Sequence, residues 1–159
     1  LDLTFREQQP DIKRVCEVIA EMLRTHLGLN VTLRELEWGK FLAERNRGTM
    51  PFYFLRWMAD YLDPQDFTSV MLHTGAEENT IGYSNPEFDR LCDAADVGRD
   101  PAKRIALYRR AQQIAIEDAP WVPIYFQKDV ELWNPRLRGV EDSLMGHLPH
   151  KRTTVEGSG

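Results

Sequence analysis

Three aspartates, Asp60, Asp63 and Asp66, recur at every third position in the middle of the chain. Their spacing does not match the alternating ligands of a calcium-binding loop, and no glutamate follows at the required distance. Asp63 precedes a proline and is expected to be the N-cap of a short helix. Asp60 follows an apolar run between Trp57 and Tyr61, where a carboxylate beside aromatic rings would suit a ligand ammonium. A hydrogen-bonded loop aspartate explains Asp60 equally well from these residues alone.

The sequence does not assemble other residues that could carry out catalysis. A glycine-rich phosphate loop and a Gly-x-Ser-x-Gly turn are both missing, and the four histidines are scattered. His147 and His150 are separated by a proline that prevents the helical spacing of a zinc-binding pair. A hydrolase that used Asp60 and Asp63 as an acid and base pair would still lack a positioned nucleophile. We therefore expect a protein that is not an enzyme and that has no metal site and no cofactor.

Charge is concentrated in the middle third of the chain. The net charge is −5 over 159 residues, and residues 51–100 contain ten acidic and three basic side chains. An acidic surface disfavours nucleic acid as a partner and attracts a cationic ligand group, although a solvated acidic face is a common alternative.

Length and composition indicate one soluble domain. Apolar residues make up 42% of the chain, which suffices for a packed core, and no apolar run is long enough to span a membrane. Cys16 and Cys92 each lie among apolar residues of a predicted helix, where free cysteine usually behaves as a small buried hydrophobe. We expect no disulfide framework.

Apolar periodicity predicts a β-α-β-α-β order in the first part of the chain. The predicted elements there are strand 1–5, helix 10–27 ended by Gly28, strand 31–36, helix 38–47 and strand 52–58. Helices are then expected over 64–72, 85–95 and 101–118, with Asn85 or Ser84 as an N-cap, and short strands over 121–126 and 130–133. This order predicts an α/β fold in three layers, with a mainly parallel sheet flanked by helices. Ligands of such sheets bind beyond the carboxyl ends of the strands, which directs attention to residues 57–64.

Two motifs in this region resemble a known family. Residues 57–64 (Trp-Met-Ala-Asp-Tyr-Leu-Asp-Pro) and 82–89 (Gly-Tyr-Ser-Asn-Pro-Glu-Phe-Asp) are similar to the C-terminal lobe of extracytoplasmic solute-binding proteins. These are the oligopeptide- and dipeptide-binding proteins that serve peptide ABC importers. Further matches in consistent order, from Leu1 to about Glu156, are Leu36-Glu37-Trp38 with Phe41-Leu42, Asp100-Pro101 leading into Leu107-Tyr108, and the segment 117–123.

The resemblance implies one lobe of a type II periplasmic-binding-protein fold, which forms one wall of a cleft that closes around a peptide. Asp60 then matches the aspartate that pairs with the peptide α-ammonium, and Trp57 matches a pocket aromatic residue. Trp38 and Arg45 match positions that contact ligand side chains or the carboxyl end, although Arg45 alone would be interpreted as a solvated helix residue. The ligand-binding residues implied by the resemblance are Asp60, Trp57, Trp38, Arg45, Met58, Ala59 and Tyr61.

The sequence also departs from the family pattern. Phe54 stands where some oligopeptide binders have an arginine for the peptide carboxylate, and Met58 replaces a small residue beside the aspartate. Relatives also bind dipeptides, sugars, nickel chelates or haem, so the substrate cannot be inferred from the fold.

We expect residues 1–152 to be the lobe and residues 153–159 to be a flexible tail, such as a cloning remnant or a frayed terminus. The chain starts directly in strand-like alternation without a signal peptide, which suggests a piece of a longer extracytoplasmic protein. Its implied partners are a peptide or other small solute, a missing N-terminal lobe and an ABC permease. The alternative is a small acidic α/β interaction domain whose Trp57 and Tyr61 patch docks a protein partner.

Overall fold

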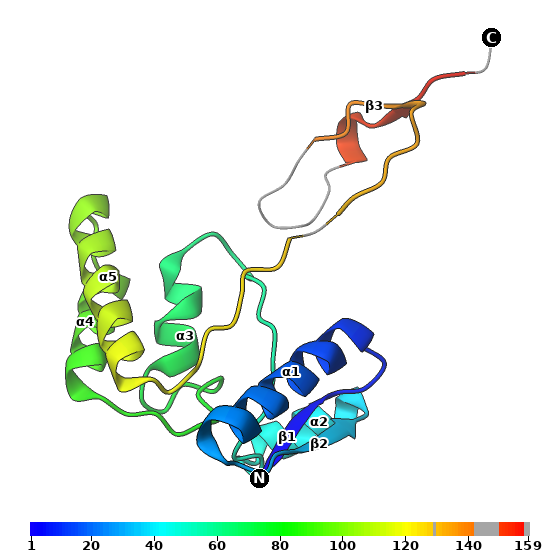
Figure 1. The fold of residues 1–159 in the computed structure, drawn as a ribbon. Coiled ribbons are helices and arrows are strands. Elements are labelled where there is room, and N and C mark those ends of the chain that lie inside the picture. Colours follow the sequence, from blue (N-terminus) through cyan, green and yellow to red (C-terminus); the bar gives the residue numbers. More distant parts are fainter. Residues whose placement is uncertain (129, 142–149, 158–159) are drawn as a thin grey trace.

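A computed structural model describes residues 1–128, 130–141 and 150–157 of the chain. These residues form an α/β arrangement with two hydrophobic cores, followed by a C-terminal segment that leads away from them (Figure 1). The elements are β1 (Asp2–Arg6), α1 (Pro10–Leu27), β2 (Thr32–Leu36), α2 (Trp38–Asn46), the 3-10 helix η1 (Pro64–Phe67), α3 (Ser69–Leu72), α4 (Pro86–Asp96), α5 (Pro101–Asp118), β3 (Leu137–Arg138), the 3-10 helix η2 (His150–Arg152) and β4 (Thr154–Val155).

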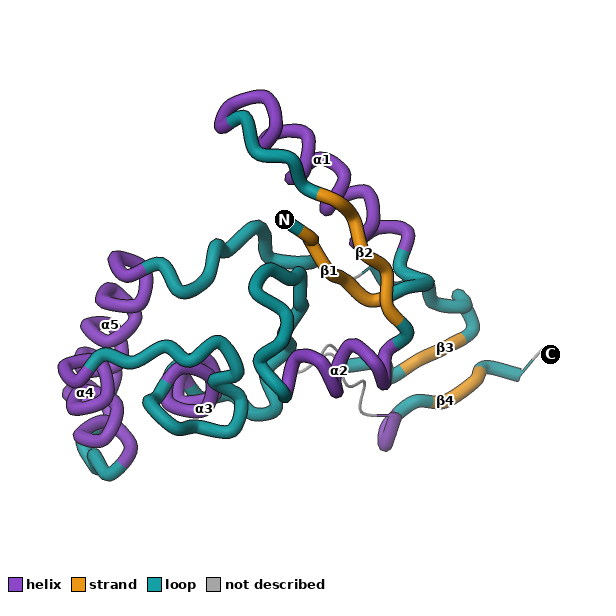
Figure 2. Tube along the Cα trace, turned by 90° about the horizontal axis from the view of Figure 1, so that it is seen from below, coloured by secondary structure: helices purple, strands orange, loops and turns teal. Residues whose placement is uncertain are grey.

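The first core forms around two parallel strands. β1 pairs with β2 in a register that places Leu3 opposite Leu33, and the two strands lie between α1 and α2 (Figure 2). Leu3 and Phe5 are buried against Ile12 and Cys16 of α1, whose apolar positions follow the expected helical spacing. Burying a side chain such as Phe5 stabilises the fold by about 1.5–3 kcal/mol. The predicted β-α-β-α order of residues 1–46 is confirmed.

The predicted third strand over residues 52–58 is wrong in extent, because only one parallel bridge joins Thr4 to Tyr53. The Thr4 amide donates to the Phe52 carbonyl at 3.1 Å, and the Phe54 amide donates to the Thr4 carbonyl at 2.8 Å. The chain then turns away from the sheet. The Arg56 guanidinium binds Asp11 and Gln9 at the start of α1, and the next residue packs against the second core.

The second core lies between α3, α4 and α5. Its buried residues include Phe88 and Cys92 of α4 and Ala111 and Ile114 of α5. As predicted, the Asn85 side chain caps α4 by accepting from the Glu87 and Phe88 amides at 3.0 and 3.2 Å. The predicted helices over 85–95 and 101–118 are therefore confirmed, whereas the expected helix over 64–72 is divided into η1 and α3.

The two cysteines lie in different cores. Cys16 packs in the first core and Cys92 in the second, and both are free and buried, as expected. Burial raises the pKa of each thiol to about 11, so neither is a thiolate at neutral pH.

The segment after α5 differs from the expectation. Residues 121–126 and 130–133, the two predicted strands, are irregular and exposed, with Phe126 and Leu132 more than nine-tenths accessible. No neighbouring strand pairs with them in the described part of the chain, which is the physical reason why their β-prone composition does not produce strands. β3 instead pairs antiparallel with β4. The boundary between a lobe over 1–152 and a tail over 153–159 remains a prediction, and β4 lies on the tail side of it.

Candidate ligand-binding site

The loop of residues 57–60 connects the two cores. It follows the bridge between β1 and Tyr53, and Trp57 packs against the second core. Asp63 then begins η1, with its side chain accepting from the Gln65 amide at 2.9 Å, which confirms its predicted role as an N-cap. The loop thus lies between the bridge to β1 on one side and the capped 3-10 helix on the other.

Asp66 is the residue that organises this loop. Its side chain is buried, and its Oδ2 atom accepts the Trp57 indole N–H at 3.1 Å and the Asp60 amide at 3.3 Å. Sequence reasoning considered Asp66 only as a calcium ligand and missed this role. The mostly polar sequence around it, with Gln65 before it and Thr68 and Ser69 soon after it, gave no signal that this acid is buried.

The Asp60 side chain faces a different environment. It is exposed, and its carboxylate has no hydrogen-bond or ion-pair partner within the described residues. Met58 and Tyr61 beside it are 59% and 39% exposed, and Ala59 is half-buried. The loop therefore presents a free carboxylate flanked by apolar surface.

Further carboxylates lie near Tyr61. Burial raises the pKa of Tyr61, and the carboxylates of Asp66, Asp63, Asp96 and Asp60 raise it further. The Tyr61 hydroxyl donates to Gln65 at 3.1 Å, which holds the ring against η1. Nearby negative charges disfavour the ionised phenol, so the direction of this shift follows from the acids around Tyr61.

Asp63 is neutralised by an arginine from another helix. The Arg104 guanidinium of α5 forms a two-pronged ion pair with the Asp63 carboxylate, one contact of which is 2.8 Å long. This pair lowers the pKa of Asp63 and leaves Asp60 as the unpaired acid of the two. Arg104 also donates to the Ala95 carbonyl at 3.0 Å, so it fixes η1 to α4 and α5 together.

Trp38 and Arg45 lie on α2, beside the first core. The Trp38 ring stacks on Phe41 with centroids 5.6 Å apart, and the Arg6 guanidinium lies 4.9 Å from the Trp38 centroid. Trp38, Arg6 and Phe54 share the lining of a small cavity of about 90 Å³. Trp38 itself is half-buried.

Arg45 is not the solvated helix residue that its position alone suggests. It is 5% exposed, and its guanidinium contacts the Glu78 carboxylate at 2.7 Å and the Glu78 carbonyl at 3.1 Å. Its Nε atom is buried without a partner among the described residues. The geometry makes Arg45 a link between α2 and the loop that contains Glu78.

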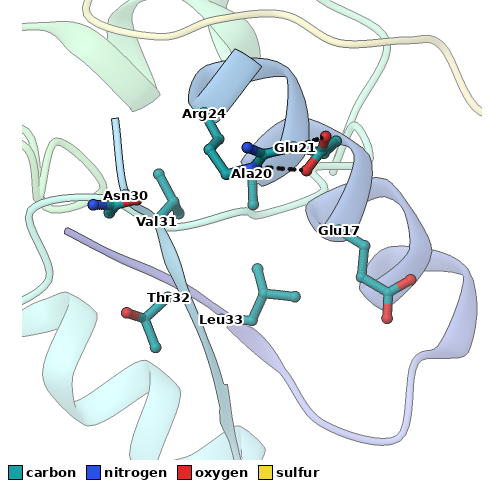
Figure 3. A pocket seen from close by; sticks show the side chains of 8 residues that line it. All are labelled: Glu17, Ala20, Glu21, Arg24, Asn30, Val31, Thr32 and Leu33. Atoms are coloured by element: carbon teal, nitrogen blue, oxygen red, sulfur yellow. Dashed lines mark hydrogen bonds and ion pairs between the residues drawn. The ribbon is translucent and has the colours of Figure 1, made fainter. Parts of the chain in front are cut away.

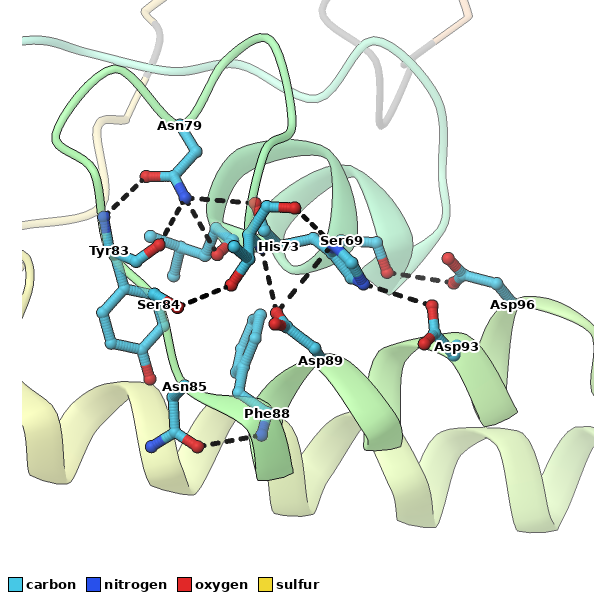
Figure 4. Close-up of polar contacts among 12 residues, drawn as sticks. Ser69, His73, Asn79, Tyr83, Ser84, Asn85, Phe88, Asp89, Asp93 and Asp96 are labelled. Carbon is cyan, nitrogen blue, oxygen red and sulfur yellow. Dashed lines mark hydrogen bonds and ion pairs between the residues drawn. The ribbon is translucent and has the colours of Figure 1, made fainter.

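That loop is fastened to α4 by a polar network (Figure 4). Asn79 donates to the Tyr83 carbonyl at 2.7 Å and accepts from the Tyr83 amide at 3.0 Å, while His73 contacts Asp93 at 3.1 Å. Asp89 accepts from the Thr74 amide at 3.0 Å. These contacts join the loop to α4, while Glu78 joins it to α2.

A larger pocket lies elsewhere, between α1 and β2 (Figure 3). Its volume is about 320 Å³, and the residues that line it include Glu17, Arg24 and Leu33. Arg24 is paired with Glu21 at 2.6 Å. None of the residues expected to bind ligand lines this pocket.

The described residues contain no group of three or more histidine, cysteine, aspartate or glutamate side chains that could hold a metal ion. The His147 position lies outside the described residues. Among the described helices, none has both the length and the apolar character needed to cross a bilayer.

Two parallel strands between helices, followed by a loop with an exposed carboxylate, form an α/β lobe. The chain belongs to the bacterial extracellular solute-binding proteins, family 5. Residues 1–79 match the model of the middle region of that family.

Individual relatives agree with this assignment. The chain is 31% identical to the dipeptide-binding protein DppE of Bacillus subtilis, over 95% of this chain and 27% of DppE. It is 33% identical to the periplasmic oligopeptide-binding protein OppA of Salmonella typhimurium, over 80% of this chain and 23% of OppA. The solved structure of the murein tripeptide binding protein MppA of Escherichia coli superposes with a TM-score of 0.79 at 27% identity, over 88% of this chain and 27% of MppA.

These comparisons confirm the predicted family and the predicted lobe of a type II periplasmic-binding-protein fold. The chain spans about a quarter of the length of these relatives. The family is one of solute-binding proteins, which agrees with the expectation that the chain is not an enzyme.

Proposed function

We propose that this chain forms one wall of the peptide-binding cleft in an extracytoplasmic receptor of an ABC importer, and that Asp60 binds the ligand's ammonium group. The single observation that carries the role of Asp60 is its exposed carboxylate, which has no partner within the described residues while its neighbour Asp63 is paired with Arg104. A partner-free carboxylate gains a charge-assisted hydrogen bond from an ammonium without first breaking an internal one.

The apolar side chains beside Asp60 supply a second source of affinity. Met58 is 59% exposed and Tyr61 is 39% exposed, so both would lose contact with water when a ligand and a facing wall cover them. Part of this gain is offset by the cost of fixing the ligand and the side chains. We propose that Trp57 and Ala59 shape the wall, since both are partly buried.

We propose more limited roles for the two residues of α2. Trp38 is half-buried, with the Arg6 guanidinium 4.9 Å from its ring centroid, and its accessible part suits contact with a ligand side chain. Arg45 is paired with Glu78, so a direct contact with a ligand carboxylate would require that the ligand compete with an existing ion pair. The burial of Arg45 favours a structural role, in which it holds α2 against the loop that contains Glu78.

The remaining parts of the receptor lie outside this chain. We propose a second lobe that faces Asp60, closure of the cleft by a hinge and recognition of the closed state by an ABC permease. The chain makes or breaks no bond in this scheme. The names of its relatives, which include dipeptide- and oligopeptide-binding proteins, favour this function over a protein-interaction domain.

Calorimetry on the complete protein encoded by the gene tests the role of Asp60. Alanine peptides of two to five residues are titrated in pairs, with a free or an acetylated amino terminus, into the parent and into Asp60→Asn. We expect the substitution to weaken binding of free peptides about 10- to 100-fold, the range for a hydrogen bond to a charged group, and to leave acetylated peptides unaffected. Asp2→Asn, the same change at an exposed aspartate of β1, is the matched control. Equal affinities of parent and Asp60→Asn for free peptides would contradict the proposal.

A further inference from the structure

Asp66 is an unusual buried acid. It is 1% exposed, and one of its oxygens, Oδ2, accepts both the Trp57 indole N–H and the Asp60 amide. Its other oxygen, Oδ1, is buried and has no hydrogen-bond partner among the described residues. Burying a carboxylate oxygen without a hydrogen-bond partner costs desolvation free energy. The two hydrogen bonds to Oδ2 offset part of that cost.

These two bonds close the loop on itself. Trp57 and Asp60 are the first and last residues of the loop 57–60, and a single atom holds both of them. One bond fixes the orientation of the indole ring, while the other fixes the backbone from which the Asp60 side chain projects. The direction of the free Asp60 carboxylate therefore depends on Asp66, although Asp66 itself is shielded from any ligand.

We propose that Asp66 is a positioning residue for ligand recognition, which aligns Trp57 and Asp60 through its Oδ2 atom. The inference rests on the proposed function, in which Asp60 selects for a free ammonium group. Asp66 would support that selectivity by holding Asp60 in place. The acceptor oxygen carries this role and the negative charge does not. An asparagine at this position retains one acceptor oxygen of the same reach, whereas an alanine retains none.

The test compares Asp66→Ala with Asp66→Asn in the complete protein. The quantity measured is the affinity for a free alanine tripeptide divided by the affinity for its acetylated form. We expect this ratio to fall about 10-fold in Asp66→Ala, because the Asp60 carboxylate is then misdirected. In Asp66→Asn the ratio should stay within about twofold of the parent, because the Asp60 carboxylate keeps its direction.

A structural control separates positioning from general loosening. Thr68 is also buried beside η1, and its hydroxyl donates to the Pro64 carbonyl at 2.8 Å without touching Trp57 or Asp60. Thr68→Val should lower the melting temperature and leave the selectivity ratio unchanged. A ratio that falls as much in Thr68→Val as in Asp66→Ala would overturn the inference.

Other outcomes also decide the question. A parent-like ratio in Asp66→Ala, or an equal fall in Asp66→Asn and Asp66→Ala, overturns the inference while a fall in Asp60→Asn keeps the proposed function. An unchanged ratio in Asp60→Asn overturns the proposed function and the ligand role of Asp66 with it. If Asp66→Ala does not fold, Asp66→Asn alone decides the question. A retained selectivity ratio with slowed or unchanged exchange of the Trp57 indole proton in Asp66→Asn supports the inference. A fallen ratio with faster exchange of that proton overturns it.

Discussion

The ion pair between Asp63 and Arg104 should control the local stability of the segment that begins η1. Asp63 has two separate tasks, since its Oδ1 atom accepts the Gln65 amide at 2.9 Å and its carboxylate pairs with Arg104 of α5. Asp63→Asn keeps an oxygen for the cap and removes the charge. Asp63→Ala removes both.

The structure sets the size of each effect. The side chains of Asp63 and Arg104 are 27% and 22% exposed, so we take the lower end of the range for a bond between charged groups, about 1.5 kcal/mol. An N-cap contributes about 1 kcal/mol. The free energy of local opening should thus fall by about 1.5 kcal/mol in Asp63→Asn and by about 2.5 kcal/mol in Asp63→Ala, which correspond to about 12-fold and 60-fold faster exchange.

Hydrogen exchange of the Gln65 amide at neutral pH measures these openings directly. A double-mutant cycle with Arg104→Gln isolates the pair from the other contacts of Arg104, and we expect a coupling of about 1.5 kcal/mol. A coupling near zero would refute the ion pair as a stabilising contact. Equal exchange in Asp63→Asn and Asp63→Ala would refute the contribution of the cap.

The pH dependence of hydrogen exchange at the Gln65 amide tests independently whether the Asp63–Arg104 pair is stabilising. Arg104 lowers the pKa of Asp63 below its ordinary value of 3.8. The stabilisation is therefore complete above that ordinary value and is lost as the pH falls through the lower pKa of the folded state. The difference in exchange between parent and Asp63→Asn should persist at pH 5 and shrink below about pH 3.8; a difference that grows on acidification would contradict the assignment.

Two further predictions concern the loop before α4 and the start of that helix. Burial lowers the pKa of His73, but the Thr74 carbonyl and the carboxylates of Asp89 and Asp93 raise it more, so its net pKa lies above 6.5. The charged His73 should stabilise the fold below pH 6.5, with this contribution lost as the pH rises through the raised pKa, and a melting-temperature series should show a step that His73→Gln abolishes. Asn85→Ala should remove the cap of α4, cost about 1 kcal/mol and speed exchange of its first amides about fivefold, whereas Asn85→Ser should recover most of the loss.

Local signals predict the helices well and the later strands poorly. Asn85 is followed by a proline and an apolar stripe, and both the start and the cap of α4 follow from those residues. A strand depends in addition on a partner that the local sequence does not contain. Residues 52–58 have strand composition, but Arg56 binds the start of α1 and Trp57 packs into the second core, so pairing ends after Phe54.

The site is predictable to the same extent. Asp60 could be selected from its type and its aromatic neighbours, and the structure adds that its carboxylate is exposed. The burial of Arg45 could not be foreseen, because its partner Glu78 is 33 residues away in the chain. Periodicity assigns a residue to a face of a helix, but not to the loop that covers that face.

The three aspartates of the motif show why spacing alone cannot assign chemistry. They have the same side chain and the same interval, yet the structure places them in three environments. Asp63 is paired with Arg104, which lies 41 residues later, and Asp66 holds Trp57, nine residues earlier. Asp60 is left without a partner within the described residues. Each environment is set by groups from elsewhere in the chain, so the acid that we propose to face the ligand is the one whose carboxylate the fold does not use for itself.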